Sequence, residues 1–157
     1  MNTREILEMA LRVENLAENI YQDLSEQFTE AKSLFKRLSV EEKQHADILT
    51  INIQFLNDID MVPPAFAEAM VPLIKKTLNT ASILLKKIMQ KDITLEEALT
   101  LCLEMEEEGV EAYFQNIMRG ESTSDTFNYL KQLYQDSMHH AQLIKDFIDK
   151  KEKGIST

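Results

Sequence analysis

The chain has 157 residues, 44% of them hydrophobic, with only three glycines and three prolines. This is enough sequence for one domain with a buried core, and the composition favours helix over sheet. The formal net charge of −10 argues against nucleic acid or an anionic membrane as a partner, since both bind through clustered lysine and arginine. The single cysteine, Cys102, excludes an internal disulfide and a zinc or rubredoxin-type iron site built from CxxC pairs. No signal peptide or membrane-spanning run stands out, so a cytoplasmic protein is expected.

Two long amphipathic helices are predicted in the first third of the chain. The first spans 3–28, with Asn2 or Thr3 as its N-cap and Glu5 placed to complete a capping box with Asn2. The second spans 29–58. The break between them is predicted from length alone, because one unbroken helix of more than about 50 residues would be unusual in a single domain.

A long connection, 59–93, follows and contains all three prolines. Proline lacks a backbone N–H and restricts the residue before it. Pro63, Pro64 and Pro72 are therefore expected to end the second helix and to interrupt helix within the connection. We expect one helical turn over 65–70 and a short extra helix over 79–90.

The third and fourth long helices fill the remainder. Thr94 and Glu97 form a predicted capping box that starts a helix ending near Gly120. The fourth helix spans 126–151, and the tail, 152–157, is expected to fray. Tight connections within each helix pair, and the long crossover between the pairs, predict one all-α domain over 1–157. Its architecture would be an antiparallel four-helix bundle with one long crossover connection.

Each long helix places polar residues in the middle of its apolar seam, which runs at alternating steps of three and four residues. The first and third helices contribute one glutamate each, and the second and fourth contribute a polar residue and a histidine three positions apart. In chain order these residues are Glu14, Glu42, His45, Glu106, Ser137 and His140. A tyrosine follows seven positions after each single glutamate, at Tyr21 and Tyr113. The chain therefore looks like a duplicated helical hairpin with a polar layer across its core.

Divalent metal ions would explain why several carboxylates lie at one level of a core. An unpaired buried ion costs several kcal/mol, and neighbouring carboxylates repel one another. Glutamate oxygens can bridge two ions, and a neutral histidine supplies one nitrogen to each. Glutamate from two helices, with Glu-x-x-His from the other two, is the ligand arrangement of ferritin-like di-iron bundles.

The pattern resembles the ferritin-like superfamily, specifically its rubrerythrin-like branch, over nearly the whole chain. The motifs that carry the resemblance are Glu14 with Tyr21, Glu42-Lys-Gln-His45, Glu106 with Tyr113, and His140 before Ala141.

The resemblance implies a di-iron site with Glu14 and Glu106 as terminal ligands and Glu42 as a bridging ligand. His45 and His140 would each give one nitrogen to a metal. Family members react with dioxygen or hydrogen peroxide, or oxidise and store iron.

The resemblance also implies that Tyr21 and Tyr113 are hydrogen-bond partners of the carboxylates, although both could be core aromatics. A homodimer is a further implication. Rubrerythrins proper carry a cysteine-rich iron domain that delivers electrons. This chain has none, so a redox cycle would need an external electron donor.

The pattern departs from the family at Ser137, where a second bridging glutamate is expected. A neutral hydroxyl is a poor substitute for a bridging carboxylate. The half-site of Glu106 and His140 therefore lacks a ligand and a negative charge, whereas the other half-site keeps its full set. We expect unequal metal sites, with the second weak, completed by solvent or empty.

Three neighbouring residues are alternatives of lower rank. Asp136 lies about 100° from Ser137 around the helix, so it is poorly placed to compensate. A shifted frame of Asp136 with His139 would put polar residues on the inner seam, so His139 is expected to be solvated or at an interface. Glu107 is the alternative to Glu106 within the acidic run 104–108.

Three functions are consistent with these observations. The first is a di-iron carboxylate protein that reacts with peroxide or dioxygen or handles iron, as a peroxidase-like or ferroxidase-like oxidoreductase. The second is a degenerate bundle that serves as a scaffold or interaction protein. The third is a single-metal site for zinc, iron or another divalent ion at Glu14, Glu42 and His45.

Overall fold

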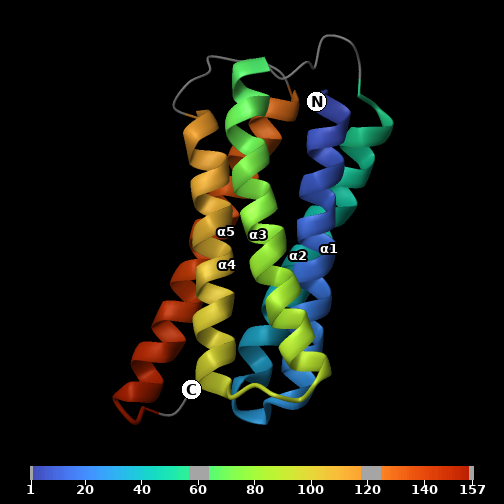
Figure 1. Cartoon of the computed structure of the whole chain (residues 1–157). Coiled ribbons are helices and arrows are strands. Elements are labelled where there is room, and N and C mark those ends of the chain that lie inside the picture. Colours follow the sequence, from blue (N-terminus) through green and yellow to red (C-terminus); the bar gives the residue numbers. More distant parts are fainter. Residues whose placement is uncertain (1, 57–63, 118–124, 156–157) are drawn as a thin grey trace.

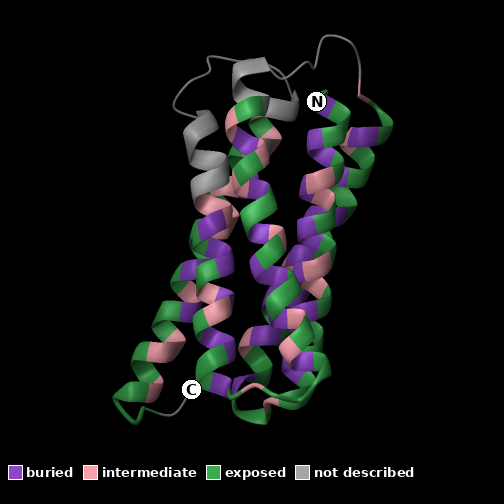
Figure 2. Ribbon diagram, in the orientation of Figure 1, coloured by how far each residue is buried: buried purple, intermediate pink, exposed green. Residues whose placement is uncertain are grey.

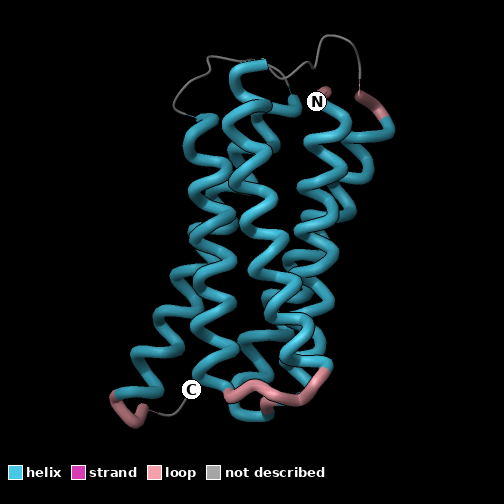
Figure 3. Tube along the Cα trace, viewed as in Figure 1, coloured by secondary structure: helices cyan, strands magenta, loops and turns pink. Residues whose placement is uncertain are grey.

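The computed structural model describes residues 2–56, 64–117 and 125–155, with the side chains of all of these except 64–67, 111–117, 125–127 and 130. Five long helices and one short 3-10 helix make up these residues, and no strand occurs among them (Figures 1 and 3). The helices are α1 (Thr3–Gln27), η1 (Thr29–Ala31), α2 (Lys32–Gln54), α3 (Pro64–Met89), α4 (Leu95–Ile117) and α5 (Asp125–Glu152). The predicted all-α helical bundle is confirmed.

Capping residues explain where α1 and α4 begin. Asn2 and Glu5 form the predicted capping box, each side chain accepting a hydrogen bond from the other's backbone N–H. Thr94 and Glu97 form the second box in the same way. Between α1 and α2, Phe28 adopts an extended conformation, and the chain turns through η1 before α2 starts.

The prediction for the connection was wrong in its central part. Residues 64–89 form one continuous helix, α3, with Pro64 at its first position and Pro72 inside it. Pro64 suits the first turn, because the N–H that proline lacks has no partner there. Pro72 is tolerated because α3 buries a regular stripe on both sides of it, formed by Met70, Ile74, Thr77, Ala81, Leu84 and Ile88. Burial of several large side chains outweighs the roughly 3 kcal/mol that an interior proline costs.

Helix α3 gives the bundle its topology. It has 26 residues and is therefore about 39 Å long. It packs against both α1 and α4, while α1 pairs with α2 and α4 pairs with α5. Because α3 carries the chain back along the bundle, α2 and α4 run in the same direction (Figure 1).

The other predicted helix ends lie within a few residues of the observed ones wherever the structure describes them. Helix α2 ends at Gln54 rather than at 58, because Phe55 leaves the helical conformation. Helix α4 is described to Ile117, and its predicted end at Gly120 lies outside the described residues. At the C-terminus, Gly154 has a positive φ of 67°, and the backbone N–H of Ile155 donates to the carbonyl of Lys150. This geometry is a helix C-cap at the end of α5. The fraying of 152–157 stays a prediction.

The apolar core consists of two clusters with a polar layer between them. One cluster fills the half of the bundle around Tyr21, Phe35 and Leu99. The other fills the opposite half around Leu7 and Leu49. Purple buried segments on facing helices trace this core along the bundle (Figure 2). Among the described residues, no helix is long and apolar enough to cross a membrane.

Candidate metal centre

The structure brings together the five ionisable residues that the seam pattern selected. Helix α1 supplies Glu14, α2 supplies Glu42 and His45, α4 supplies Glu106, and α5 supplies His140. All five are buried, with no more than 9% of any residue exposed. They lie at the level that separates the two apolar clusters. Their side-chain atoms form two overlapping groups that share Glu42.

The first group contains Glu14, Glu42 and His45. The Nδ1 atom of His45 lies 3.0 Å from Oε2 of Glu42 and 3.3 Å from Oε2 of Glu14. One imidazole nitrogen therefore faces two buried carboxylates that come from different helices.

The second group contains Glu42, Glu106 and His140. The Nδ1 atom of His140 lies 3.0 Å from Oε1 of Glu42 and 3.7 Å from Oε1 of Glu106. It is not aligned for a hydrogen bond, and it has no hydrogen-bond partner among the described residues although the side chain is 1% exposed. The imidazole rings of His45 and His140 stack with their centroids 5.5 Å apart. A buried imidazole nitrogen that lies beside two carboxylates without a hydrogen bond to either has the position of a metal ligand.

The outer nitrogen of each histidine meets a carboxylate from the helix of the other histidine. Nε2 of His140, on α5, lies 2.9 Å from Oε2 of Glu41, on α2. Nε2 of His45, on α2, lies 3.2 Å from Oδ2 of Asp136, on α5. Such an outer carboxylate fixes the ring orientation and leaves the inner nitrogen free to bind a metal.

Sequence reasoning missed Glu41 and undervalued Asp136. Asp136, expected about 100° from Ser137 around the helix, reaches a ring on the neighbouring helix. A signal was present in the repeat, because an acidic residue precedes both Glu42 and Ser137.

Each of the two outer carboxylates is bonded by a side chain that lies one turn earlier in the same helix. Nε of Arg37 lies 2.8 Å from Oε1 of Glu41, and Nε2 of Gln132 donates to Oδ1 of Asp136 at 2.9 Å. His139 is exposed, and its Nε2 lies 3.1 Å from an Arg37 guanidinium nitrogen. The alternative frame with His139 as an inward residue is thus wrong, because the 100° step per residue turns it outward.

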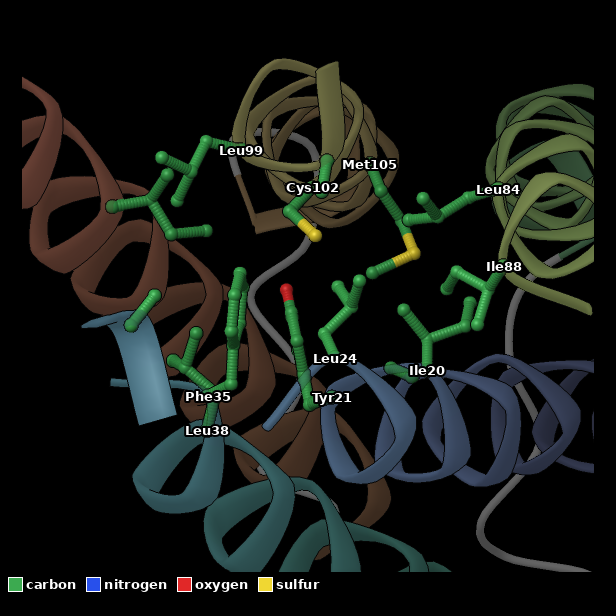
Figure 4. Close-up of a cluster of buried hydrophobic side chains, with 14 of the residues drawn as sticks. Ile20, Tyr21, Leu24, Phe35, Leu38, Leu84, Ile88, Leu99, Cys102 and Met105 are labelled. Carbon is green, nitrogen blue, oxygen red and sulfur yellow. The ribbon is translucent and has the colours of Figure 1, made fainter. Parts of the chain in front are cut away.

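Glu106 rather than Glu107 faces the polar layer. Glu107 is 52% exposed at its side chain and pairs with Lys145 at 2.7 Å. The hydroxyl of Tyr21 donates a short hydrogen bond to Oε1 of Glu106. In Figure 4, Tyr21 extends from α1 toward α4 and Cys102. The side chain of Tyr113 lies outside the described residues.

Burial and mutual charge set the protonation of the polar layer without metal. Burial alone lowers the pKa of a histidine, but Glu14 and Glu42 raise the pKa of His45 to about 10. Glu106 and Glu42 likewise raise the pKa of His140 to about 12 against the effect of burial. Both rings are therefore charged at neutral pH and balance part of the buried negative charge.

The carboxylates are shifted in opposite directions. Burial and the charge of Glu42 raise the pKa of Glu14 well above its usual range and raise that of Glu106. Burial acts to raise the pKa of Glu42 as well, but its interactions with His140 and His45 outweigh burial and hold it well below the usual range. Glu42, between the two rings, carries the most stable negative charge of the layer.

A small cavity of about 20 Å³ adjoins the three buried glutamates. Ser137 from α5, Gly109 from α4 and Thr77 from α3 also line it. Thr77 was not predicted, because the crossover was not expected to form a helix at this level. A methyl group added at Gly109 would lie 3.7 Å from Oγ of Ser137, so small residues from α4 and α5 face each other here.

Carboxylate oxygens and imidazole nitrogens in two groups are a donor set for divalent transition metals. No curated protein and no solved structure matches the chain. The rubrerythrin family model matches residues 5–148, which is most of the chain. Membership of this family implies iron binding. Together with the helical bundle and its two Glu/His groups, the match shows that the chain belongs to the rubrerythrin family, which is a ferritin-like family.

Proposed function

We propose that the polar layer binds two iron ions and that the loaded protein reduces hydrogen peroxide. Glu14, Glu42 and His45 would hold one ion, and Glu42, Glu106 and His140 the other. The observation that carries the proposal is the orientation of both histidines. Each points Nδ1 at the shared carboxylate of Glu42, and each directs Nε2 to an outer carboxylate. This is the arrangement that metal-ligating histidines adopt in proteins.

Two ferrous ions, when bound, would supply the two electrons that, with two protons from the solvent, reduce one hydrogen peroxide to two water molecules. The chain itself controls the surroundings of that chemistry. Apolar clusters above and below the layer exclude bulk water from it. The Tyr21 hydroxyl keeps one Glu106 oxygen hydrogen-bonded, which orients that carboxylate.

Regeneration would need electrons from outside this sequence, because its one cysteine is buried and the sequence has no second one to pair with. Burial and the charge of Glu106 raise the pKa of the Cys102 thiol, which keeps it protonated and unreactive. An external electron donor is therefore part of the proposal. The homodimer and the cytoplasmic location stay predictions, which sedimentation and cell fractionation would test.

The test is anaerobic. Protein loaded with ferrous iron receives hydrogen peroxide in steps, and Mössbauer spectra count the ferric iron formed. The proposal expects about two irons oxidised per peroxide without trapped hydroxyl radical. Iron that reacts one per peroxide and releases radical, as free ferrous iron does, would refute it. A parallel titration with dioxygen separates peroxide reduction from ferroxidase activity.

Ser137 favours a second candidate, a single-metal site at Glu14, Glu42 and His45. This group has two carboxylates and one imidazole and suits zinc as well as iron. Elemental analysis of the purified protein separates the candidates. One zinc per chain, undisplaced by ferrous iron, would support the single-metal site. A folded chain without metal would leave the scaffold role.

A further inference from the structure

Ser137 leaves a gap in the ligand set of the candidate metal centre. In the repeat, Ser137 and His140 on α5 correspond to Glu42 and His45 on α2. The side chain at position 137 lines the cavity of about 20 Å³ that adjoins Glu42 and Glu106. A cavity of this size has room for about one water molecule or a slightly larger group. The cavity therefore has space beside position 137, where the family pattern would place a glutamate carboxylate.

The opposite wall of the gap is also small and does not fill it. Gly109 on α4 has no side chain, and a methyl group there would still lie 3.7 Å from Oγ of Ser137. Nδ1 of His140 has no hydrogen-bond partner among the described residues, and it lies 3.0 Å from Glu42 and 3.7 Å from Glu106, two of the carboxylates that line the cavity. This buried nitrogen adds an imidazole donor to the carboxylates at this level, and such a mixed donor set indicates a metal-binding level.

Charge indicates what kind of ligand would fill the gap. This step rests on the proposed function. Glu14, Glu42 and Glu106 contribute three negative charges, whereas two divalent ions bring four positive charges. The outer carboxylates of Glu41 and Asp136 compensate less, because their side chains are 28% and 31% exposed and bond the outer histidine nitrogens. The buried layer therefore lacks one negative charge and one oxygen donor.

We propose that a small carboxylate anion of the size of formate binds beside Ser137 and completes the two-metal site. The anion supplies the oxygens and the charge that a glutamate at position 137 would supply. The Ser137 hydroxyl can donate a hydrogen bond to it. The size of the cavity excludes larger carboxylates such as benzoate.

The experiment titrates metal-free protein with cobalt(II) and follows the visible absorption of the bound ion. Titrations are run in sodium chloride, sodium formate and sodium benzoate at equal ionic strength. The variants are wild type, Ser137→Glu, and Ser33→Glu as a control that adds the same charge at an exposed position. Circular dichroism verifies that each variant is folded.

Formate should tighten the second cobalt ion in wild type and in Ser33→Glu by about tenfold or more, as expected for two coupled ligands. Benzoate should have no effect. Ser137→Glu should bind the second ion in chloride alone and gain nothing from formate. Equal binding in formate and chloride by wild type would overturn the proposal, even if Ser137→Glu does not fold. Two tightly bound ions without formate would leave the proposed function intact, whereas no cobalt in any folded variant would refute both.

Discussion

Metal loading should release at least two protons per chain at pH 8. Without metal, His45 and His140 have pKa values of about 10 and about 12, so both rings are protonated at that pH. Each ring must lose its Nδ1 proton before that nitrogen can bind a metal. With an ordinary pKa near 6.5, each ring would hold only about 0.03 of the second proton, the one that makes it positively charged, at pH 8. The expected release is therefore more than tenfold above that of ordinary histidines, roughly two protons against less than 0.1.

Isothermal titration calorimetry measures this number directly. Cobalt(II) is titrated into metal-free protein at pH 8, with sodium formate present, in two buffers with different ionisation enthalpies, and the difference in heat gives the protons released. His140→Gln should release one proton fewer than wild type. His139→Gln is the matched control, because the neighbouring ring is exposed and should leave the number unchanged. Release of less than one proton by a wild-type chain that binds cobalt would refute the reasoning.

Three further predictions follow from the same structure. Glu41→Gln should weaken cobalt binding by about 10–100-fold in spectroscopic titrations, because it removes the negative charge that holds the outer nitrogen of His140. Unchanged affinity would show that this carboxylate does not orient the ring. In chelator, the free energy of unfolding should fall as pH rises from 6.5 toward 10, since the pKa of His45 is raised and the folded chain holds that proton more tightly than the unfolded chain. Urea denaturation at pH 6.5 and pH 9.5 measures this change, and a higher free energy of unfolding at pH 9.5 would contradict the prediction. Pro72→Ala should stabilise the chain by about 2 kcal/mol in urea denaturation. Alanine restores a backbone N–H that can donate to the carbonyl of Glu68, four residues earlier in α3. A loss of stability would contradict this explanation of α3.

The inward residues of the polar layer could be predicted because they follow local rules. A side chain three or four positions from a buried leucine lies on the same helix face. Glu42 and His45 therefore had to share the seam of α2. Likewise, the capping boxes at Asn2 and Thr94 depend on residues only three apart. Neither inference required knowledge of how the helices pack.

The outer residues could not be predicted in the same way. Contact between Asp136 and His45 depends on the rotation of α5 against α2, which no local pattern specifies. The error in α3 has another cause. A proline favours the end of a helix, but burial of the regular stripe from Met70 to Ile88 outweighs that preference in α3. Thr77 was missed for the same reason.

If the polar layer binds metal, the iron content of the chain depends on Glu42. Wild type and Glu42→Ala are loaded anaerobically with ferrous iron in formate buffer, desalted, and analysed for iron per chain. Glu42 contacts both histidines, so its removal damages both groups at once. The account predicts about two irons in wild type and less than one in a folded Glu42→Ala chain. Equal iron in both proteins, or no iron in folded wild type, would contradict it.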